Sequence, residues 1–335
     1  MRISRKPNDW LGSGRNEEEC RQTLIITHTI ANYETLLSKI RDKFGGICPD
    51  NIVLLRYFQF LYRFCYSPFL ADDVRAKGII YKKPPMTRAR DNDIRFYMNE
   101  SRFLFSNGLS LLLEFKNVIE DIQNRIVKYF DEFIVDEVQD IAGRDFDFLE
   151  KLMETDVDHL YVGDFYQHTY DTSRDGNVNR NLFDDKSKYE KRFKDKGFQC
   201  DCISMVNSWR CTPTVCQFIT ENLGIEIHSN RSADDSTVLL ISDPVRIRQI
   251  AGDCSIVKLH YKEGACFGDN HYNWGESKGE DHHNDVCVYL NKSTASAYHK
   301  GKLSELRPQT RNKLYVAITR ARGNVYLVNE KELRE

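Results

Sequence analysis

Short apolar runs that do not alternate with polar residues recur along the chain, and each is followed by a segment long enough for a helix. Eight such runs occupy residues 23–27, 51–55, 132–138, 159–163, 238–241, 255–259, 285–290 and 324–328. Strands that are apolar on both sides are typical of parallel sheets covered by helices on both faces. The pattern therefore predicts an α/β protein with parallel sheets and helical crossovers.

Helical periodicity and charge divide the chain further. Residues 32–44, 109–130 and 213–223 have the length and apolar spacing of helices. Residues 67–107 are charged and irregular, which predicts a small helical insertion in the first lobe. Residues 171–197 are charged without apolar period, which predicts a linker. The predicted organisation is a polar N-terminal segment at 1–22, a first lobe at 23–170, that linker, and a second lobe at 198–335.

Length and composition fit a two-domain globular protein. The chain has 335 residues and a formal net charge of -2, with 48 Lys+Arg against 50 Asp+Glu. No run approaches the ~18 uncharged apolar residues of a membrane span, and no apolar segment follows the basic start. We therefore expect no membrane association and a cytoplasmic location. The near-zero charge excludes a generally basic coat protein for nucleic acid, although a local basic groove is compatible with it.

The ten cysteines do not form a metal or disulfide framework. The only close pairs are Cys200 with Cys202 and Cys211 with Cys216, and neither has the spacing of a zinc ribbon. The sequence predicts reduced thiols that pack as small hydrophobic side chains, as in a reducing compartment.

The sequence DEVQD at 136–140 is the sharpest candidate for chemistry. It ends a predicted buried strand, so Asp136 is expected at the carboxyl edge of a sheet, where open α/β sheets bind ligands. One carboxylate can hold Mg²⁺ through its water shell while its neighbour, Glu137, orients and deprotonates a water molecule. A solvated turn after a strand is the alternative interpretation.

Three later segments add phosphate-binding chemistry. After the strand near 160 come Gly163, Asp164 and the amide of Gln167. Arg210 ends the sequence NSWR, and two arginines lie in LYVAITRAR at 314–322. Because a guanidinium is planar and permanently charged, it suits phosphoryl oxygens, although an arginine is more often part of a surface ion pair.

Taken in order, these segments resemble the superfamily 1 helicases of the UvrD/Rep type. DEVQD resembles the Walker B element, and VGDFYQHTY at 162–170 resembles motif III. NSWR is similar to motif IV, and LYVAITRAR to motif VI. Residues 27–29 resemble motif Ia and residues 277–279 resemble motif V. The likeness runs from about residue 23 to residue 328.

The resemblance implies two RecA-like lobes with ATP and Mg²⁺ between them and single-stranded DNA across their tops. It implies that Asp136 coordinates Mg²⁺, that Glu137 activates water and that Gln167 senses the γ-phosphate. Arg210 and Arg320 would be the arginine fingers.

It also implies further contacts to nucleotide and DNA. The remaining residues expected near the nucleotide are Asp164, Tyr170 and Arg322. The residues expected along a groove for single-stranded or duplex DNA are Thr27, His28, Thr29, Ser277 and Lys278. His28 stands where the family usually has an aromatic ring, so weaker stacking is expected.

The phosphate-binding loop departs most from the family. The family pattern G-x-x-x-x-G-K-[ST] follows a strand and opens a helix. The only candidate lies at 12–16, with Arg15 in place of the lysine and Asn16 in place of the hydroxyl residue. Residues 1–11 are mostly polar, so no strand is predicted before it. Three explanations stay open: a truncated or mis-started chain, a degenerate helicase, or a partner protein that completes the site.

The spacing between motifs IV and V also departs from the family. Arg210 and Lys278 are separated by 67 residues (278 − 210 − 1), which leaves no room for the large subdomain of full UvrD-type proteins. In motif V, acidic and histidine residues at 280–283 replace the family's residues. The chain most resembles compact members from bacterial mobile elements and defence islands.

Three functions follow from these observations. The first is an ATP-dependent translocase or helicase subunit on single-stranded DNA, in defence or repair, with impaired or partner-dependent ATPase activity. The second is a non-enzymatic pseudo-helicase that serves as a DNA-binding or protein-docking scaffold. The third is a metal-dependent nuclease that uses Asp136, Glu137, Asp140 and Asp164.

Overall fold

A computed structural model describes residues 1–5, 21–82, 92–169, 178–278 and 283–333. These residues form two compact units. The N-terminal unit contains residues 2–164 and 178–201, and the C-terminal unit contains Met1, 165–169 and 202–333. Among the helices in these ranges, none has both the length and the apolar character that crossing a bilayer requires.

The N-terminal unit is built on a six-stranded sheet with the order β3-β2-β6-β7-β1-β8. The strands are β1 (Arg2–Arg5), β2 (Thr23–Thr27), β3 (Ile52–Arg56), β6 (Glu132–Asp136), β7 (Asp158–Val162) and β8 (Gln199–Asp201). Strands β3, β2, β6 and β7 are parallel to one another, whereas β1 runs antiparallel to both of its neighbours. The four strands predicted in this half are confirmed, and β6 ends two residues early because a 3₁₀ turn follows it.

Strands β1 and β8 were not predicted from the sequence. Ile3 is fully buried in β1, and the Arg5 guanidinium lies 4.8 Å from the centre of the Phe198 ring. Helix α7 (Lys186–Lys194) precedes β8, and Arg192 in it forms an ion pair with Glu150. Residues 178–197, expected as part of a linker, and residues 198–201, expected in the second lobe, therefore belong to the N-terminal unit. Strands of three or four residues with at most one buried side chain are too short to show a period in the sequence.

The helices of this unit cover its sheet and pack against one another. Helix α1 (Ile30–Lys43) begins after the cap residue Thr29 and contacts β3, and α6 (Arg144–Leu152) contacts α4 and α5. The single helix predicted over 109–130 is in fact two, α4 (Leu109–Phe115) and α5 (Ile119–Tyr129). The break occurs because Asn117 adopts a left-handed backbone conformation with φ of 55°.

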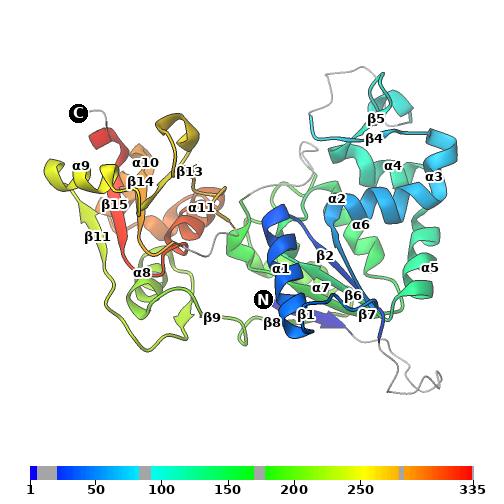
Figure 1. The fold of residues 1–335 in the computed structure, drawn as a ribbon, viewed down its shortest axis with the longest axis horizontal. Helices are drawn as coiled ribbons and strands as arrows, with labels where there is room; N and C mark the ends of the chain where they lie inside the picture. The colour runs from blue at the N-terminus through cyan, green and yellow to red at the C-terminus, as the bar shows by residue number, and fades with distance from the viewer. Residues whose placement is uncertain (6–20, 83–91, 170–177, 279–282, 334–335) are drawn as a thin grey trace. The chain divides into compact units, whose positions relative to one another are not determined.

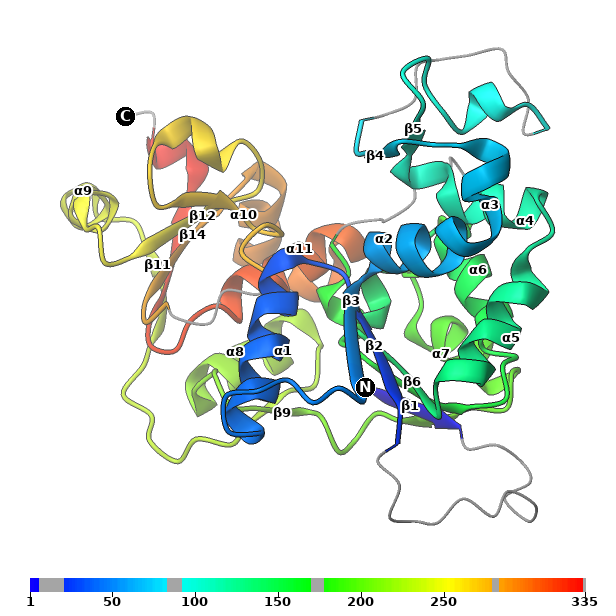
Figure 2. The ribbon, with the colours of Figure 1, turned by 45° about the vertical axis from the view of Figure 1, so that its right-hand side comes forward.

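The segment predicted as an insertion, 67–107, has its own small structure. It contains α3 (Ser67–Val74), which follows the short α2 (Tyr57–Gln59) and a π-helical stretch. Strands β4 (Gly78–Ile80) and β5 (Phe103–Phe105) pair with each other as a separate two-stranded sheet. Figures 1 and 2 both show this pair beside α3 and α4, apart from the six-stranded sheet.

The C-terminal unit is built on a five-stranded parallel sheet with the order β11-β15-β14-β12-β13. The strands are β11 (Val238–Ile241), β12 (Val257–His260), β13 (His271–Asn273), β14 (Val286–Leu290) and β15 (Val325–Asn329). The helices are α8 (Pro213–Leu223), α9 (Pro244–Gly252), α10 (Lys292–His299) and α11 (Pro308–Ile318). Strands β9 (Asn207–Ser208) and β10 (His228–Ser229) form a separate parallel pair. All five residues of β14 are buried, which agrees with the predicted two-sided cover.

Both units are thus α/β folds with parallel-rich sheets, as predicted. The boundary between them differs from the expected one, because residues 165–169 pack within the C-terminal unit. The Tyr166 ring lies 6.2 Å from that of Tyr315 on α11, and the Arg311 guanidinium lies 5.6 Å from the Tyr166 ring centre. The N-terminal unit's first stretch therefore ends at Asp164 rather than at residue 170.

Candidate functional site: a carboxylate edge and an arginine turn

Carboxylate groups gather where β6 and β7 end. The two strands are parallel neighbours, and Asp136 pairs with Val162. Their carboxyl ends therefore meet at one edge of the sheet, which brings the DEVQD turn beside Asp164. We call this group the carboxylate edge: Asp136, Glu137, Gln139, Asp140 and Asp164. Glu137 has a left-handed conformation with φ of 56°, so the chain turns sharply as soon as β6 ends.

A buried amide links the two turns of the carboxylate edge. Gln139 is fully buried, and its Nε2 donates a hydrogen bond to the Glu137 carboxylate. Its Oε1 accepts a hydrogen bond of 3.0 Å from the backbone N–H of Asp164. A Cβ on Gly163 would lie 2.1 Å from Gln139 Oε1, so only glycine leaves room for this side chain. Sequence reasoning missed Gln139. Its signal was that it is the one amide in DEVQD, whose other residues are three acids and a valine.

The oxygen donors of the carboxylate edge fit Mg²⁺. Asp136 is the last residue of β6, Asp164 follows the end of β7 by two residues, and both are half-buried. Mg²⁺ is usually held by one or two carboxylates together with water and phosphate. Within the described ranges, no group of three or more His, Cys, Asp or Glu side chains is arranged to hold a metal ion. With Asp136 and Asp164, the carboxylate edge offers Mg²⁺ oxygen ligands of this kind.

The direction of β1 bears on the phosphate-binding loop, whose candidate residues 12–16 lie outside the described part of the chain. Arg2 pairs with Val162 and Arg5 pairs with His159, so β1 runs away from the carboxylate edge. Thr23, which begins β2, pairs with Glu132 at the amino end of β6. A phosphate-binding loop normally follows the carboxyl end of a parallel strand. A strand does precede the candidate loop, contrary to expectation, but it ends at the opposite edge of the sheet.

The expected DNA-binding residues of the N-terminal unit lie near the end of β2. Thr27 is buried, and its Oγ1 has no hydrogen-bond partner among the described residues. The His28 ring packs edge-on against Phe58 at 6.1 Å between ring centres. Thr29 caps α1, because its side-chain oxygen accepts a 3.1 Å hydrogen bond from the Asn32 N–H. The Thr29 hydroxyl thus has a structural use at the helix start.

In the C-terminal unit, two guanidinium groups lie at the end of α11. Arg210 Nη1 donates to the Thr319 carbonyl at 3.0 Å. Arg320 Nε donates to the Val316 carbonyl at 3.1 Å, and its Nη2 lies 3.4 Å from Thr319 Oγ1. The last carbonyls of a helix lack partners within the helix and carry its negative dipole end, so they attract cations. We call this region the arginine turn: Arg210, Arg231, Arg320 and Arg322.

The charges of the arginine turn favour an anion. Burial, together with the nearby guanidinium of Arg320, lowers the pKa of Arg210 to about 10. An anion placed beside the two groups would relieve their repulsion. Arg231, which sequence reasoning missed, donates through Nη1 to the carbonyls of Arg210 (3.0 Å) and of the exposed Arg322. No local pattern marks Arg231, since its role comes from the pairing of β9 with β10.

The other expected residues of this unit are placed as follows. Ser277 is fully buried, and its Oγ donates to the Trp274 carbonyl at 3.0 Å. Its own carbonyl accepts from Arg320 Nη1 at 3.5 Å, so it supports the arginine turn rather than presenting its hydroxyl to DNA. Lys278 is half-buried beside it, and Gln167 ends the 3₁₀ turn that packs with α11.

Two residues of the expected motifs need separate mention. Tyr170 lies outside the described residues. Trp209, the neighbour of Arg210, is 82% exposed, and sequence reasoning did not single it out. An exposed indole next to the half-buried Arg210 can stack on a planar group that an anion carries.

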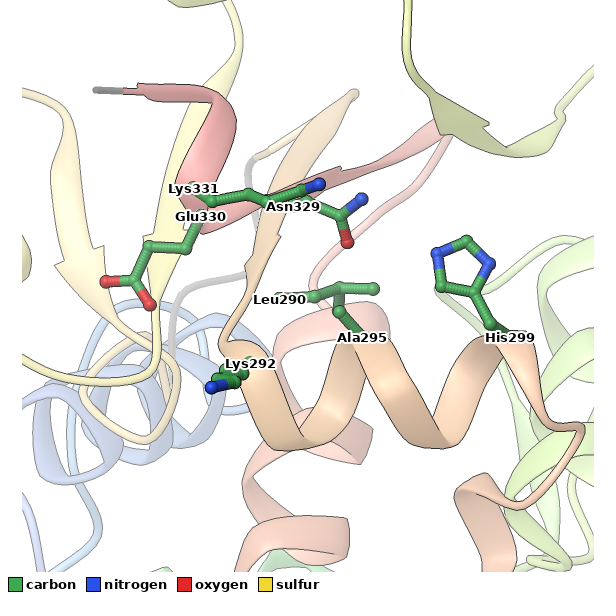
Figure 3. Close-up of a pocket in the computed structure, with 7 residues that line it drawn as sticks. All are labelled: Leu290, Lys292, Ala295, His299, Asn329, Glu330 and Lys331. Atoms are coloured by element: carbon green, nitrogen blue, oxygen red, sulfur yellow. The ribbon is translucent and has the colours of Figure 1, made fainter. Parts of the chain in front are cut away.

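A cavity of about 430 Å³ lies at the carboxyl ends of β14 and β15. Figure 3 shows the α10 side chains facing these strand ends across it. It is lined by Leu290, Lys292, Ala295, His299, Asn329, Glu330 and Lys331. None of these is an expected site residue, so the cavity is separate from both groups described above.

Comparison with solved structures finds helicases among the chains that match. Arterivirus nonstructural protein 10, a helicase solved in complex with DNA, aligns with a TM-score of 0.47 and 12% identity over 93% of this chain and 55% of its own. The PRRSV helicase aligns with a TM-score of 0.43 and 16% identity over 93% of this chain and 48% of its own. This chain spans about half the length of either. No family model and no curated protein matches the chain. The fold assignment therefore rests on strand order and direction.

Proposed function

We propose that this protein is a superfamily 1 helicase-like subunit of the UvrD/Rep type, which acts on single-stranded DNA and hydrolyses ATP weakly or only with a partner protein. One observation carries the proposal: Gln139 fastens the Walker B-like turn to the motif III-like turn, so Asp136, Glu137 and Asp164 share one sheet edge. The order of the motifs in the sequence supports it independently.

Each region has a chemical role in this proposal. Asp136 and Asp164 supply the oxygen ligands for Mg²⁺, which would neutralise phosphate charge when it is bound. Glu137 accepts a proton from water, and its carboxylate is oriented by the Gln139 amide. Arg210 and Arg320 bind phosphoryl oxygens, for which their planar forks are suited. A role in defence or repair is part of the same proposal, by resemblance alone.

The test compares Glu137→Gln with Glu132→Gln, a matched control at the other end of β6. With Mg-ATP and single-stranded DNA present, Glu137→Gln should lower the hydrolysis rate about 100-fold, the usual contribution of a general base. The dissociation constant for a non-hydrolysable ATP analogue, measured by calorimetry, should stay the same. Equal hydrolysis by both variants, or no binding of the analogue with or without DNA, would refute the enzymatic proposal.

The direction of β1 favours a second candidate, a pseudo-helicase that binds DNA without using nucleotide. Because β1 ends at the edge opposite Asp136, this strand does not lead the chain toward the carboxylate edge. This candidate predicts that Asp136→Ala leaves the affinity for a fluorescent single-stranded oligonucleotide unchanged, with or without Mg-ATP. A nucleotide-dependent shift in wild-type anisotropy that Asp136→Ala abolishes would exclude it.

A further inference from the structure

Two cysteines meet at the start of α8, directly after Arg210. Thr212 is the N-cap of this helix, so Cys211 occupies the position before the cap and Cys216 the fourth helical position. Side chains at these two positions usually pack together as a hydrophobic staple. Both cysteines are buried, at 1% and 3% exposure, in the core cluster of the C-terminal unit. Both are free thiols.

The two thiols differ in their surroundings. A hydrogen bond between them lowers the pKa of Cys211 and raises that of Cys216; Ser208, Arg210 and Arg320 lower that of Cys211 further. Asp234 is the charged group that acts on Cys216. One thiol of the pair is thus disposed to ionise beside two cations, while the other stays protonated, which is the arrangement of an attacking and a resolving cysteine.

The Cys211 thiol also belongs to the arginine turn. Cys211 Sγ lies 3.6 Å from the Thr319 carbonyl, the same oxygen that Arg210 Nη1 contacts at 3.0 Å. The Cys211 carbonyl accepts from Ser229 Oγ at 2.7 Å, and Cys216 Sγ lies 4.0 Å from it. A change at either sulfur therefore acts directly on the backbone that positions Arg210.

We propose that Cys211 and Cys216 are an oxidative modification site, at which a peroxide converts the thiol pair into an intramolecular disulfide. The Cys211 thiolate attacks one peroxide oxygen, the O–O bond breaks and a sulfenic acid forms as water leaves. The Cys216 sulfur then attacks the Cys211 sulfur, the S–O bond breaks, and a second water leaves. In total two thiols lose two hydrogens and one hydrogen peroxide becomes two waters.

The disulfide alters the arginine turn in a definite way. Joining the sulfurs at about 2.05 Å removes the S–H that faces the Thr319 carbonyl and pulls the residue after Arg210 toward α8. Because both cysteines are buried, a small oxidant would reach them through local opening of the segment before α8, whose Trp209 is 82% exposed. Any effect on nucleotide affinity rests on the proposed function, whereas disulfide formation does not.

Peptide mapping tests the site directly. Trypsin releases residues 211–231 as one peptide, which contains both cysteines and no internal Lys or Arg. The folded, reduced protein is treated with hydrogen peroxide, then denatured, alkylated with N-ethylmaleimide and digested. We expect this peptide to lose two hydrogens and both maleimides, reversibly with dithiothreitol. The fraction of this peptide that loses its maleimide labels should be at least about tenfold the fraction of the Cys287 peptide that does so. The reason is that burial raises the pKa of the Cys287 thiol to about 12, which slows its oxidation.

A variant separates the disulfide from simple oxidation. Cys216→Ser should leave Cys211 as a sulfenic acid that dimedone traps, with no loss of two hydrogens. If this variant does not fold, wild-type mapping alone decides. Full alkylation of both cysteines after peroxide, or conversion no faster than at Cys287, would overturn the proposal. A disulfide that leaves nucleotide-analogue affinity unchanged would refute its effect on the arginine turn but not the site.

Discussion

The carboxylate edge and the arginine turn are held in place by different means. At the carboxylate edge, the backbone sets the geometry: two parallel strands end together, Glu137 takes a left-handed conformation, and Gly163 leaves room for one amide. At the arginine turn, side chains hold the backbone, because Arg210, Arg231 and Arg320 all donate to main-chain carbonyls. Removing an acid should therefore change the chemistry with little effect on folding, whereas removing an arginine should change both.

The largest expected effect comes from Arg320→Ala. The side chain is 1% exposed and donates to the carbonyls of Val316 and Ser277. Its loss leaves a cavity and removes the donor to the Ser277 carbonyl, while Thr319 Oγ1 still donates to the Val316 carbonyl. We therefore expect the free energy of unfolding of the C-terminal unit to fall by about 3 kcal/mol. Urea titration followed by tryptophan fluorescence measures this, because Trp274 is fully buried in that unit's core.

Two variants are the controls. Arg322→Ala removes an exposed arginine two residues further on and should cost less than about 0.5 kcal/mol. Asp136→Ala, at the carboxylate edge, should cost less than about 1 kcal/mol. A loss for Asp136→Ala as large as that for Arg320→Ala would remove the distinction between the two regions.

Gly163→Ala should have the next largest effect, and it acts at the carboxylate edge through the backbone. The added methyl would occupy the place of Gln139 Oε1, so Gln139 must leave both Glu137 and the Asp164 N–H. Displacing a buried amide should cost about 2 kcal/mol in the N-terminal unit. Gly252→Ala, whose Cβ would meet nothing within 4 Å at the end of α9, should be neutral or slightly stabilising by thermal unfolding. Equal melting temperatures for the two variants would contradict the proposed role of Gln139.

The last expected effect depends on pH and comes from His159, which lies near the start of β7, away from the carboxylate edge. Burial lowers the pKa of His159 to about 4, and its ring packs among Phe133, Tyr161 and Phe198. Below the ordinary histidine pKa of about 6.5 the unfolded chain binds a proton that the folded chain does not, so stability falls as pH falls from 6.5 toward 4. From pH 7.5 to pH 5 this residue should account for about 2 kcal/mol.

His159→Gln should remove that part of the pH dependence. The measurement is the free energy of unfolding from urea titrations at pH 7.5 and pH 5, with the exposed His228→Gln as the control. The pH-dependent loss should be smaller in His159→Gln than in wild type, and the same as wild type in His228→Gln. If the free energy of unfolding falls by the same amount from pH 7.5 to pH 5 in all three proteins, the lowered pKa of His159 does not contribute to the pH dependence.

Local patterns in the sequence determined much of the architecture. The apolar runs identified each long parallel strand to within about two residues, because burial on both faces requires an uninterrupted apolar stretch. The same reasoning placed Asp136 and Asp164 at strand ends, and parallel strands then bring those ends to one edge. Helix 213–223 was predicted with its bounds, since Thr212, Pro213 and Gly224 are strong start and stop signals.

Long-range packing alone fixes the direction of β1, the link through Gln139, the place of Arg231 and the contact of residues 165–169 with α11. Each of these depends on pairing between residues far apart in the chain. A short polar segment such as 2–5 has one buried side chain and therefore shows no hydrophobic periodicity. Periodicity records which side chains are buried. It does not record which distant strand, carbonyl or helix they meet, because that is fixed by packing of the whole unit.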